Sequence, residues 1–329
     1  MNMKKNSIYI YFLSHFLFLG GGFAKICSLS NKDTVLSFIL GTLLGIILVY
    51  IISKLSSSKK DSFFFKIIYF IYILFNIFII LVILSNFLSS YFLLYTPSII
   101  SCMPFIILAS LLASKKIKGI YNVAFVLFYF SLFIITIKTL LLTNEFNYNN
   151  VLPILSVSTS KVIKSSFLYA FISCSPLLIF INDSMDFKSN LKYYLLASLT
   201  NIIVALTITF ILGEMVNVYS YPEYTILRRI RFFNFIENIE NFICINWFFD
   251  LFISLSIFIL KLKSTLNVKY NIIPFLISFS ILYIVYTFFS NNFYNTIILY
   301  NIFPYICGGF IGIFIIFYSI KFLNFKLKR

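Results

Sequence analysis

YIYFLSHFLFLGGGFAKIC, from Tyr9 to Cys27, is the first long apolar segment of the chain and the stretch that decides its fold. Three consecutive glycines, Gly20, Gly21 and Gly22, interrupt it past its middle. A glycine in a helix interior costs about 1 kcal/mol relative to alanine, so the run predicts a break in a membrane-spanning helix. Unsatisfied backbone survives in hydrocarbon only where it lines a protein-enclosed cavity, which makes the break a candidate binding site. The alternative is close helix packing through small residues.

A second interruption lies in the apolar segment LYAFISCSPLLIFIND, where Ser173, Cys174 and Ser175 precede Pro176. Proline removes a backbone donor and clashes with the preceding turn, so it frees carbonyl groups there. An ordinary proline kink would explain this segment by itself. The two interrupted segments are the first and the sixth of ten, however, and together they fit two five-helix repeats of inverted topology. In such repeats the half-helix ends face a site at mid-membrane depth.

The composition is that of an integral membrane protein: 61% of the 329 residues are hydrophobic and only 11% are charged. The apolar runs exceed the about 18 residues that are typical of a membrane helix. We therefore predict an all-α membrane protein with ten transmembrane helices in a single transmembrane domain, 1–329. The first five-helix repeat covers 1–143, an outer connection covers 144–165, and the second repeat covers 166–329. The ten predicted helices span 8–28, 35–53, 64–93, 97–113, 120–142, 166–182, 191–212, 238–260, 271–289 and 295–320.

Lysine and arginine give the chain a formal net charge of +16. Because these residues lie mostly in short loops between apolar segments, they fit contact with anionic head groups of the lipid bilayer, and nucleic acid is not expected as a partner. Most of them share one side of the membrane if the N-terminus is inside, so we predict that both termini are cytoplasmic. On the opposite side, residues 224–233 read as a short amphipathic helix at the interface.

One acidic residue, Asp250, lies well inside an apolar run, in INWFFDLFISL. A carboxylate at mid-membrane depth costs roughly 2.5–3.5 kcal/mol, so an acid in this place is a functional candidate by default. Asn246 and Ser254 lie four residues to either side and share its helix face. The alternative is a structural, hydrogen-bonded buried acid. The only histidine, His15, could titrate or bind a ligand, although a packing role is the simpler reading.

In the third predicted helix Tyr69, Tyr72 and Asn76 form a polar stripe that could face the same cavity. The five cysteines are far apart in the sequence and form no CxxC pair, so neither a metal site nor a disulfide framework is expected. No GxSxG, Walker A, HExxH or kinase signature is present. We therefore expect no enzymatic activity and no cofactor.

Several stretches resemble one known family. YPEYTILRRIRFFNFIENIENFICINWFFDLFISLSIFILKLKSTLN, which begins at Tyr221, is similar to a region of the B-subunit proteins of spore germinant receptors. Those proteins have a Tyr-Pro, an arginine-containing amphipathic segment and an F.ER.E-like turn before the eighth span. Here that turn reads from Phe235 to Glu240. The hairpin SLSNKDTVLSFILGTLLGIILVYIISKL and the outer segment FNYNNVLPILSVSTSKVIKSS are also similar to the family's counterparts.

The resemblance carries expectations about fold and partners. The family belongs to the amino acid–polyamine–organocation permeases, whose LeuT-type fold is a 5+5 inverted repeat. It implies a small nutrient, an amino acid in many members, bound between the first, third, sixth and eighth spans. It also implies A-type and C-type receptor subunits as partners and a place in the bacterial inner membrane of the spore. One departure stands out: family members often carry an acid near the sixth-span break, where this chain has Ser173, Cys174 and Ser175.

The leading hypothesis is therefore a nutrient-sensing subunit of a spore germination receptor, with its ligand at the two breaks. The positive end of a half-helix would attract a ligand carboxylate, and Asp250, Asn246, Tyr72 and Asn76 would add contacts. A stand-alone amino-acid permease, coupled to protons or sodium through Asp250, is the first alternative. A structural membrane subunit that transports nothing is the second.

Overall fold

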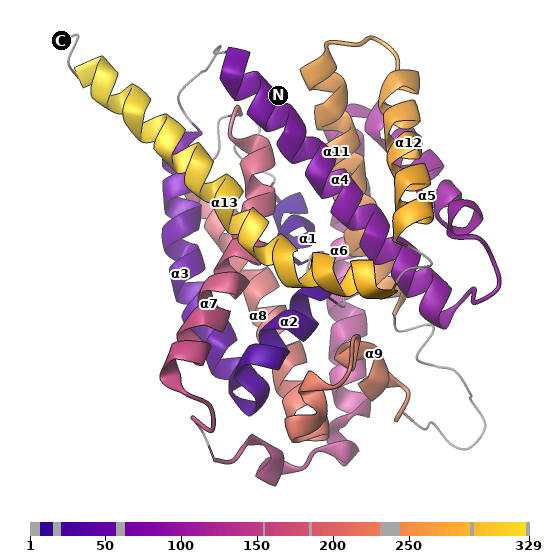
Figure 1. Cartoon of the computed structure of the whole chain (residues 1–329), viewed down its shortest axis with the longest axis vertical. Helices are drawn as coiled ribbons and strands as arrows, with labels where there is room; N and C mark the ends of the chain where they lie inside the picture. Colours follow the sequence, from indigo (N-terminus) through magenta and orange to yellow (C-terminus); the bar gives the residue numbers. More distant parts are fainter. Residues whose placement is uncertain are drawn as a thin grey trace.

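The computed structural model describes residues 7–15, 21–56, 63–153, 155–183, 186–230, 244–289 and 293–326. Within these ranges every regular element is an α-helix or a short 3-10 helix (Figure 1). In chain order the elements are α1 (Tyr9–His15), α2 (Gly21–Ser30), η3 (Asn31–Asp33), α3 (Thr34–Leu55), α4 (Phe63–Tyr91), α5 (Ser98–Ser114), α6 (Lys116–Leu141), η4 (Thr143–Glu145), η5 (Tyr148–Val151), α7 (Thr159–Cys174), η6 (Ser175–Phe180), α8 (Phe187–Leu212), η7 (Gly213–Asn217), α9 (Pro222–Leu227), α11 (Ile245–Leu266), α12 (Ile272–Phe288) and α13 (Phe293–Lys326).

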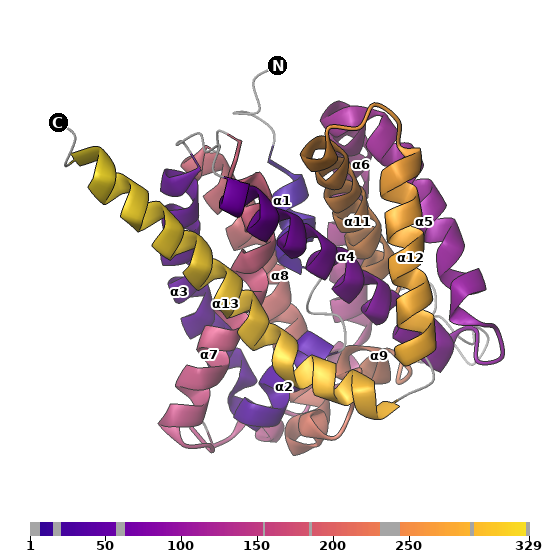
Figure 2. The same ribbon diagram turned by 45° about the horizontal axis from the view of Figure 1, so that its top comes forward.

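The all-helical membrane class that the composition predicts is confirmed. Seven helical stretches of the described chain are long and apolar enough to cross a bilayer. Two further apolar helices, α5 and α12, have 17 residues each, slightly fewer than the about 20 that an untilted crossing needs. Figure 2 shows α5 and α12 side by side at one flank of the bundle. Ten crossings therefore stay a prediction.

The second predicted interruption falls where an α-helix ends, and the first includes residues outside the described ranges. In the first segment α1 ends at His15 and α2 begins at Gly21, so Gly21 and Gly22 form the first turn of a new helix. Gly20 lies outside the described residues. In the sixth segment the α-helix α7 ends at Cys174, and a tighter 3-10 turn, η6, takes over at Ser175 with Pro176 in its first turn. A mid-helix change to 3-10 geometry is typical of a hinge or a strained sequence.

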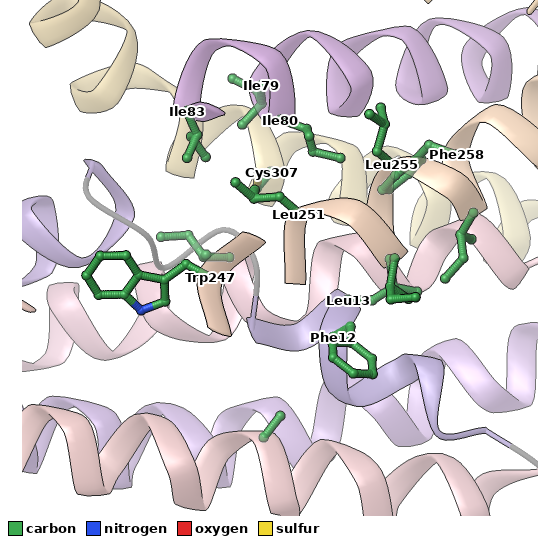
Figure 3. Packing of buried hydrophobic residues seen from close by; sticks show 14 of the residues in the cluster. Phe12, Leu13, Ile79, Ile80, Ile83, Trp247, Leu251, Leu255, Phe258 and Cys307 are labelled. Carbon is green, nitrogen blue, oxygen red and sulfur yellow. The ribbon is translucent and has the colours of Figure 1, made fainter. Parts of the chain in front are cut away.

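The hydrophobic core lies where α1, α4, α11 and α13 meet (Figure 3). Side chains of α4 such as Ile80 face Leu251 and Leu255 of α11, while Phe12 of α1 lies on the other side of α11. α4 is apolar on almost every side, which is typical of a helix that runs through the centre of a protein in a membrane. The helices that surround α4 and α11 expose their other faces, as lipid-contacting helices do.

α3 approaches its neighbours through two glycines, Gly41 and Gly45, four residues apart. A Cβ atom added at Gly41 would lie 2.7 Å from the backbone oxygen of Ser166 on α7, and one at Gly45 would lie 1.7 Å from the hydroxyl of Tyr194 on α8. Small residues at this spacing allow helix backbones to come close in membranes. The close approach of α3 to both α7 and α8 depends on the missing side chains.

We expect Gly41→Ala to destabilise the protein by about 1–3 kcal/mol, because the new methyl group meets backbone that has no room to move. The measurement is the midpoint of thermal unfolding of the purified chain in detergent. Gly309→Ala is the matched control, since no atom lies within 4 Å of the position its Cβ would take. That control should be neutral or slightly stabilising, as alanine favours the helix. Equal destabilisation by both variants would contradict the packing role of Gly41.

The end of the bundle that carries α9 is held together by Asp33, in the turn between α2 and α3. Its buried carboxylate accepts hydrogen bonds from the backbone N–H of Leu155 (2.7 Å), the hydroxyl of Ser156 (3.2 Å) and the backbone N–H of Val157 (2.9 Å). These three residues directly precede α7. One side chain thus fixes the start of the helix that leads to the second interruption.

The amphipathic helix expected at 224–233 is shorter than expected and is buried. α9 ends at Leu227, and residues 231–243 lie outside the described residues. Tyr224, Ile226 and Leu227 are each at most 4% exposed, and the ring of Tyr224 lies 4.3 Å from that of Tyr91 on α4. α9 therefore packs against the helix bundle, because its apolar side chains find protein partners.

Candidate functional site

A small enclosed cavity lies beside the interruption between α1 and α2. Its volume is about 30 Å³, enough for one or two water molecules. Six elements contribute side chains, and charged and amide groups predominate among them. The lining residues are His15 of α1, Phe23 of α2, Ile135 and Lys138 of α6, Asn201 and Val204 of α8, Glu223 of α9, and Asn246, Trp247 and Asp250 of α11.

His15 and Asp250 form a buried pair across the cavity. The His15 Nδ1 atom lies 2.7 Å from Asp250 Oδ2, within the range of a charge-assisted hydrogen bond. The ring of Tyr11 stacks on the imidazole, with centroids 5.7 Å apart and planes 8° from parallel. The histidine that could have been a packing residue is therefore the direct partner of the intramembrane acid.

Two further charged side chains face the cavity. Lys138, on the last turns of α6, is 4% exposed, and Glu223, on α9, is 3% exposed. Within the described chain no hydrogen bond or ion pair holds the Lys138 ammonium group. Burying an unpaired charge is costly, and the carboxylates of Asp250 and Glu223, which line the same cavity, offset that cost. The cavity thus combines two acids with one lysine and one histidine.

The cavity wall also contains polar atoms that are not satisfied by the described protein. Asn246 Oδ1 and Asp250 Oδ1 are both buried and have no hydrogen-bond partner among the described residues. Each unsatisfied buried acceptor costs about 1–3 kcal/mol. Two such acceptors on one face of α11, next to a lysine without a partner, indicate that the cavity binds something polar that carries donors.

The cavity is closed in this conformation. Phe23 and Trp247 contribute aromatic walls, and α9 covers it, with the Tyr224 ring 6.3 Å from the indole of Trp247. Its volume admits water but no larger solute. A ligand with more than a few heavy atoms therefore needs α9 or the start of α2 to move before it can bind.

The other predicted contact residues form a separate, tightly packed cluster. The Tyr72 hydroxyl on α4 donates to the backbone oxygen of Ser175 at 2.7 Å. Asn76 donates to the backbone oxygen of Tyr72 on its own helix, and Ser173 donates to that of Tyr169. Cys174 points at the backbone oxygen of Gly45 at 3.6 Å. None of these side chains lines the cavity, and their role as ligand contacts stays a prediction.

The Tyr72 bond belongs to a set that holds η6 in place. Tyr69 of α4 donates to the backbone oxygen of Ile179 and Tyr318 of α13 to that of Ile181. A 3-10 turn that follows an α-helix leaves carbonyl groups without regular helical partners. Tyrosine hydroxyls satisfy them here, so η6 is fixed by side chains from two other helices.

Reasoning from the sequence placed Asn246 and Asp250 in the site but missed Lys138 and Glu223. Lys138 lies near the end of the predicted span 120–142, and Glu223 lies between the predicted spans 191–212 and 238–260. The available signal was the lone lysine within the apolar run LFIITIKTLL, because a charge in such a run needs a partner. Nothing comparable marks Glu223, which reaches the cavity only because α9 folds inward.

Comparison with known proteins identifies a family that the chain matches. A sequence model of the family described as spore germination protein matches residues 7–293, which is most of the chain. No curated protein matches the chain.

Proposed function

The chain belongs to the spore germination protein family, and from that premise we propose that it senses a small nutrient of the amino-acid class at the cavity beside His15 and Asp250. Its apolar helices and its family make it an integral membrane protein. In this proposal it acts by binding, without catalysis or a cofactor. It resides in the inner membrane of the spore with both termini cytoplasmic, and A-type and C-type receptor subunits respond to its state.

The observation that carries the proposal is the set of charges and unsatisfied acceptors in one closed cavity. An amino acid presents an ammonium group with three donors and a carboxylate with acceptors only. Asp250, Glu223 and the free Asn246 oxygen complement the ammonium group, while Lys138 complements the carboxylate. Both ends of the ligand therefore find partners of opposite character in one cavity.

Ligand binding would act by population shift. The closed cavity is too small for an amino acid, so the ligand binds a conformer in which α9 or α2 has moved. A ligand shifts such an equilibrium only by its differential affinity for the two states. Contacts with His15 on α1 and with Asp250 on α11 would give the ligand a higher affinity for one of the two conformers. The two residues lie on opposite sides of the cavity, so a shift of α1 relative to α11 would change its size.

We also propose that the fold is the LeuT-type 5+5 inverted repeat. The supporting contacts are reciprocal. In the predicted halves, α4 is the third helix of the first repeat and bonds to the interruption of the second repeat through Tyr72 and Ser175. α11 is the third helix of the second repeat and bonds to the interruption of the first through Asp250 and His15. Inverted repeats place their broken helices in equivalent surroundings, as these two contacts do.

Asn246→Ala tests the proposal directly. Spores in which this variant replaces the protein should need an about ten-fold higher nutrient concentration for half-maximal germination, because one hydrogen bond to the ligand ammonium is lost. The measurement is the fall in optical density against nutrient concentration, at protein levels matched by immunoblot. Asn122→Ala, at an exposed position of α6, is the matched control. An unchanged nutrient response in the Asn246 variant would refute binding at this cavity.

The second candidate is an amino-acid permease coupled to an ion gradient. The buried pair of His15 and Asp250 favours it, because titratable groups inside a membrane often mark ion pathways. Purified protein in proteoliposomes distinguishes the two functions. A permease accumulates labelled amino acids and stops when the proton or sodium gradient is collapsed, whereas a sensor binds the same solutes without accumulation. Absence of both binding and uptake would leave a structural subunit.

A further inference from the structure

An open groove of about 460 Å³ lies on the outside of the bundle. It shares no lining residue with the charged cavity, and its wall is mostly apolar. It follows the edge where α8 meets α3, two helices that pack against each other in Figure 1. Thr42 of α3 and the α8 residues Lys192, Leu195, Leu199 and Ile202 form most of its wall. Leu195 and Leu199 are 41% and 53% exposed, so the groove faces the surroundings of the helix bundle.

The shape of the groove fits a hydrocarbon chain. Lys192, Leu195, Leu199 and Ile202 follow one another at intervals of three and four residues, which places them on one face of α8. They cover about 15 Å along the helix axis at 1.5 Å per residue, about half of the 30 Å hydrocarbon thickness of a bilayer. An apolar hollow of this size does not hold ordered water. A lipid acyl chain that spans one leaflet would fill the groove.

One end of the groove is positively charged. Lys192 closes that end, and Lys188 lies one turn earlier on α8, in the first turn of the helix. Lys54 of α3 is near the same end, since its neighbour Tyr50 packs its ring edge-on against Phe187, 5.4 Å away. The N-terminus of a long helix adds partial positive charge. Asp186, the N-cap of α8, is the one acidic side chain described beside these lysines.

We propose that this groove is a binding site for an anionic phospholipid, with one acyl chain along α8 and the head-group phosphate between Lys188 and Lys192. Basic pockets between membrane helices on one face of a protein are suited to anionic head groups. Tyr50 and Tyr193 lie at the level of the lysines, where aromatic rings favour the membrane interface. We favour a lipid over a helix of another protein or of a second copy, because the wall is mostly apolar and the positive charge lies at one end, where a head-group phosphate complements it.

Lipid binding to the full-length chain in detergent tests the site. The probes are phosphatidylglycerol and phosphatidylcholine with identical acyl chains, counted per protein by native mass spectrometry. The unaltered chain should prefer phosphatidylglycerol. In the double variant Lys188→Gln/Lys192→Gln, the preference for phosphatidylglycerol over phosphatidylcholine should fall about five-fold for each lysine that is replaced. Lys115→Gln/Lys118→Gln, which removes the same charge from exposed positions at the end of α5 and in the first turn of α6, should keep it.

A second variant tests the apolar part. Leu199→Trp fills the groove from an exposed position, so it should lower the binding of both lipids without unfolding the chain. Equal binding of the two lipids by the unaltered chain would overturn the proposal, and so would an equal loss of preference in the two lysine variants. A lipid-free dimer that Leu199→Trp converts to a monomer would also overturn it, because the occupant would then be a second copy.

Discussion

Spores that carry Asp250→Asn are expected to need a nutrient concentration about 10- to 100-fold higher for half-maximal germination. The reason is the loss of one charge-assisted hydrogen bond to a ligand ammonium group, worth about 1.5–3 kcal/mol. The variant also leaves His15 without its carboxylate partner and removes one of the two acids that line the cavity with Lys138. Removing one member of a buried ion pair typically costs 3–5 kcal/mol of stability, so protein level must be measured beside the response.

Glu145→Gln is the matched control for Asp250→Asn, because it removes one carboxylate from an exposed position in η4. It should change neither germination nor protein level. A normal germination curve for Asp250→Asn at normal protein level would show that the carboxylate is not needed for nutrient binding.

The His15→Gln/Asp250→Asn double variant separates a ligand contact from an internal pair. If the pair is only structural, replacing both residues restores part of what one replacement loses, since neither member is left beside an unmatched partner. If Asp250 contacts the ligand, thermal stability recovers in the double variant while the nutrient response does not. We expect the second outcome, because Asp250 Oδ1 is unsatisfied and the bond to His15 uses only Oδ2.

Asp33→Ala is expected to destabilise the protein by about 3 kcal/mol or more, the second large effect. The substitution removes three hydrogen bonds to a buried carboxylate, from Leu155, Ser156 and Val157, and a hydrogen bond to a charged group contributes about 1.5–3 kcal/mol. It also frees the segment before α7, so the nutrient response should weaken with stability. The measurement is the thermal midpoint in detergent, with germination as the second readout.

Glu214→Gln provides the control next to Asp33. Glu214 pairs with Lys32 at 3.0 Å, but its side chain is 75% exposed, and an exposed pair contributes at most about 1 kcal/mol. The buried acid should therefore matter at least three times as much as the exposed one. Similar effects from the two substitutions would mean that net charge at this end of the bundle, not the Asp33 hydrogen bonds, sets its stability.

The residues differ in how far their roles could be predicted. Asp250 was predictable because an acid in an apolar run is costly wherever the chain places it, and Asn246 follows from helical spacing. His15 was ambiguous, since a lone histidine carries no spacing signal. Glu223 was not predictable, because its place depends on α9 packing into the bundle. The sequence did not predict the burial of α9 against the bundle for the same reason: amphipathic spacing does not say which partner buries the apolar face.

The sequence by itself determined that the chain resides in a membrane and that its sixth apolar segment is interrupted at Ser175 and Pro176. Length, apolar composition and helix-breaking residues act locally, so they can be read without knowing any long-range contact. Only the tertiary structure decided which polar groups share a cavity. His15 and Asp250 are 235 positions apart in the chain, and they share a cavity with Lys138 and Glu223 because α1, α6, α9 and α11 come together there. Such contacts depend on the shapes of whole helices, which no local pattern encodes.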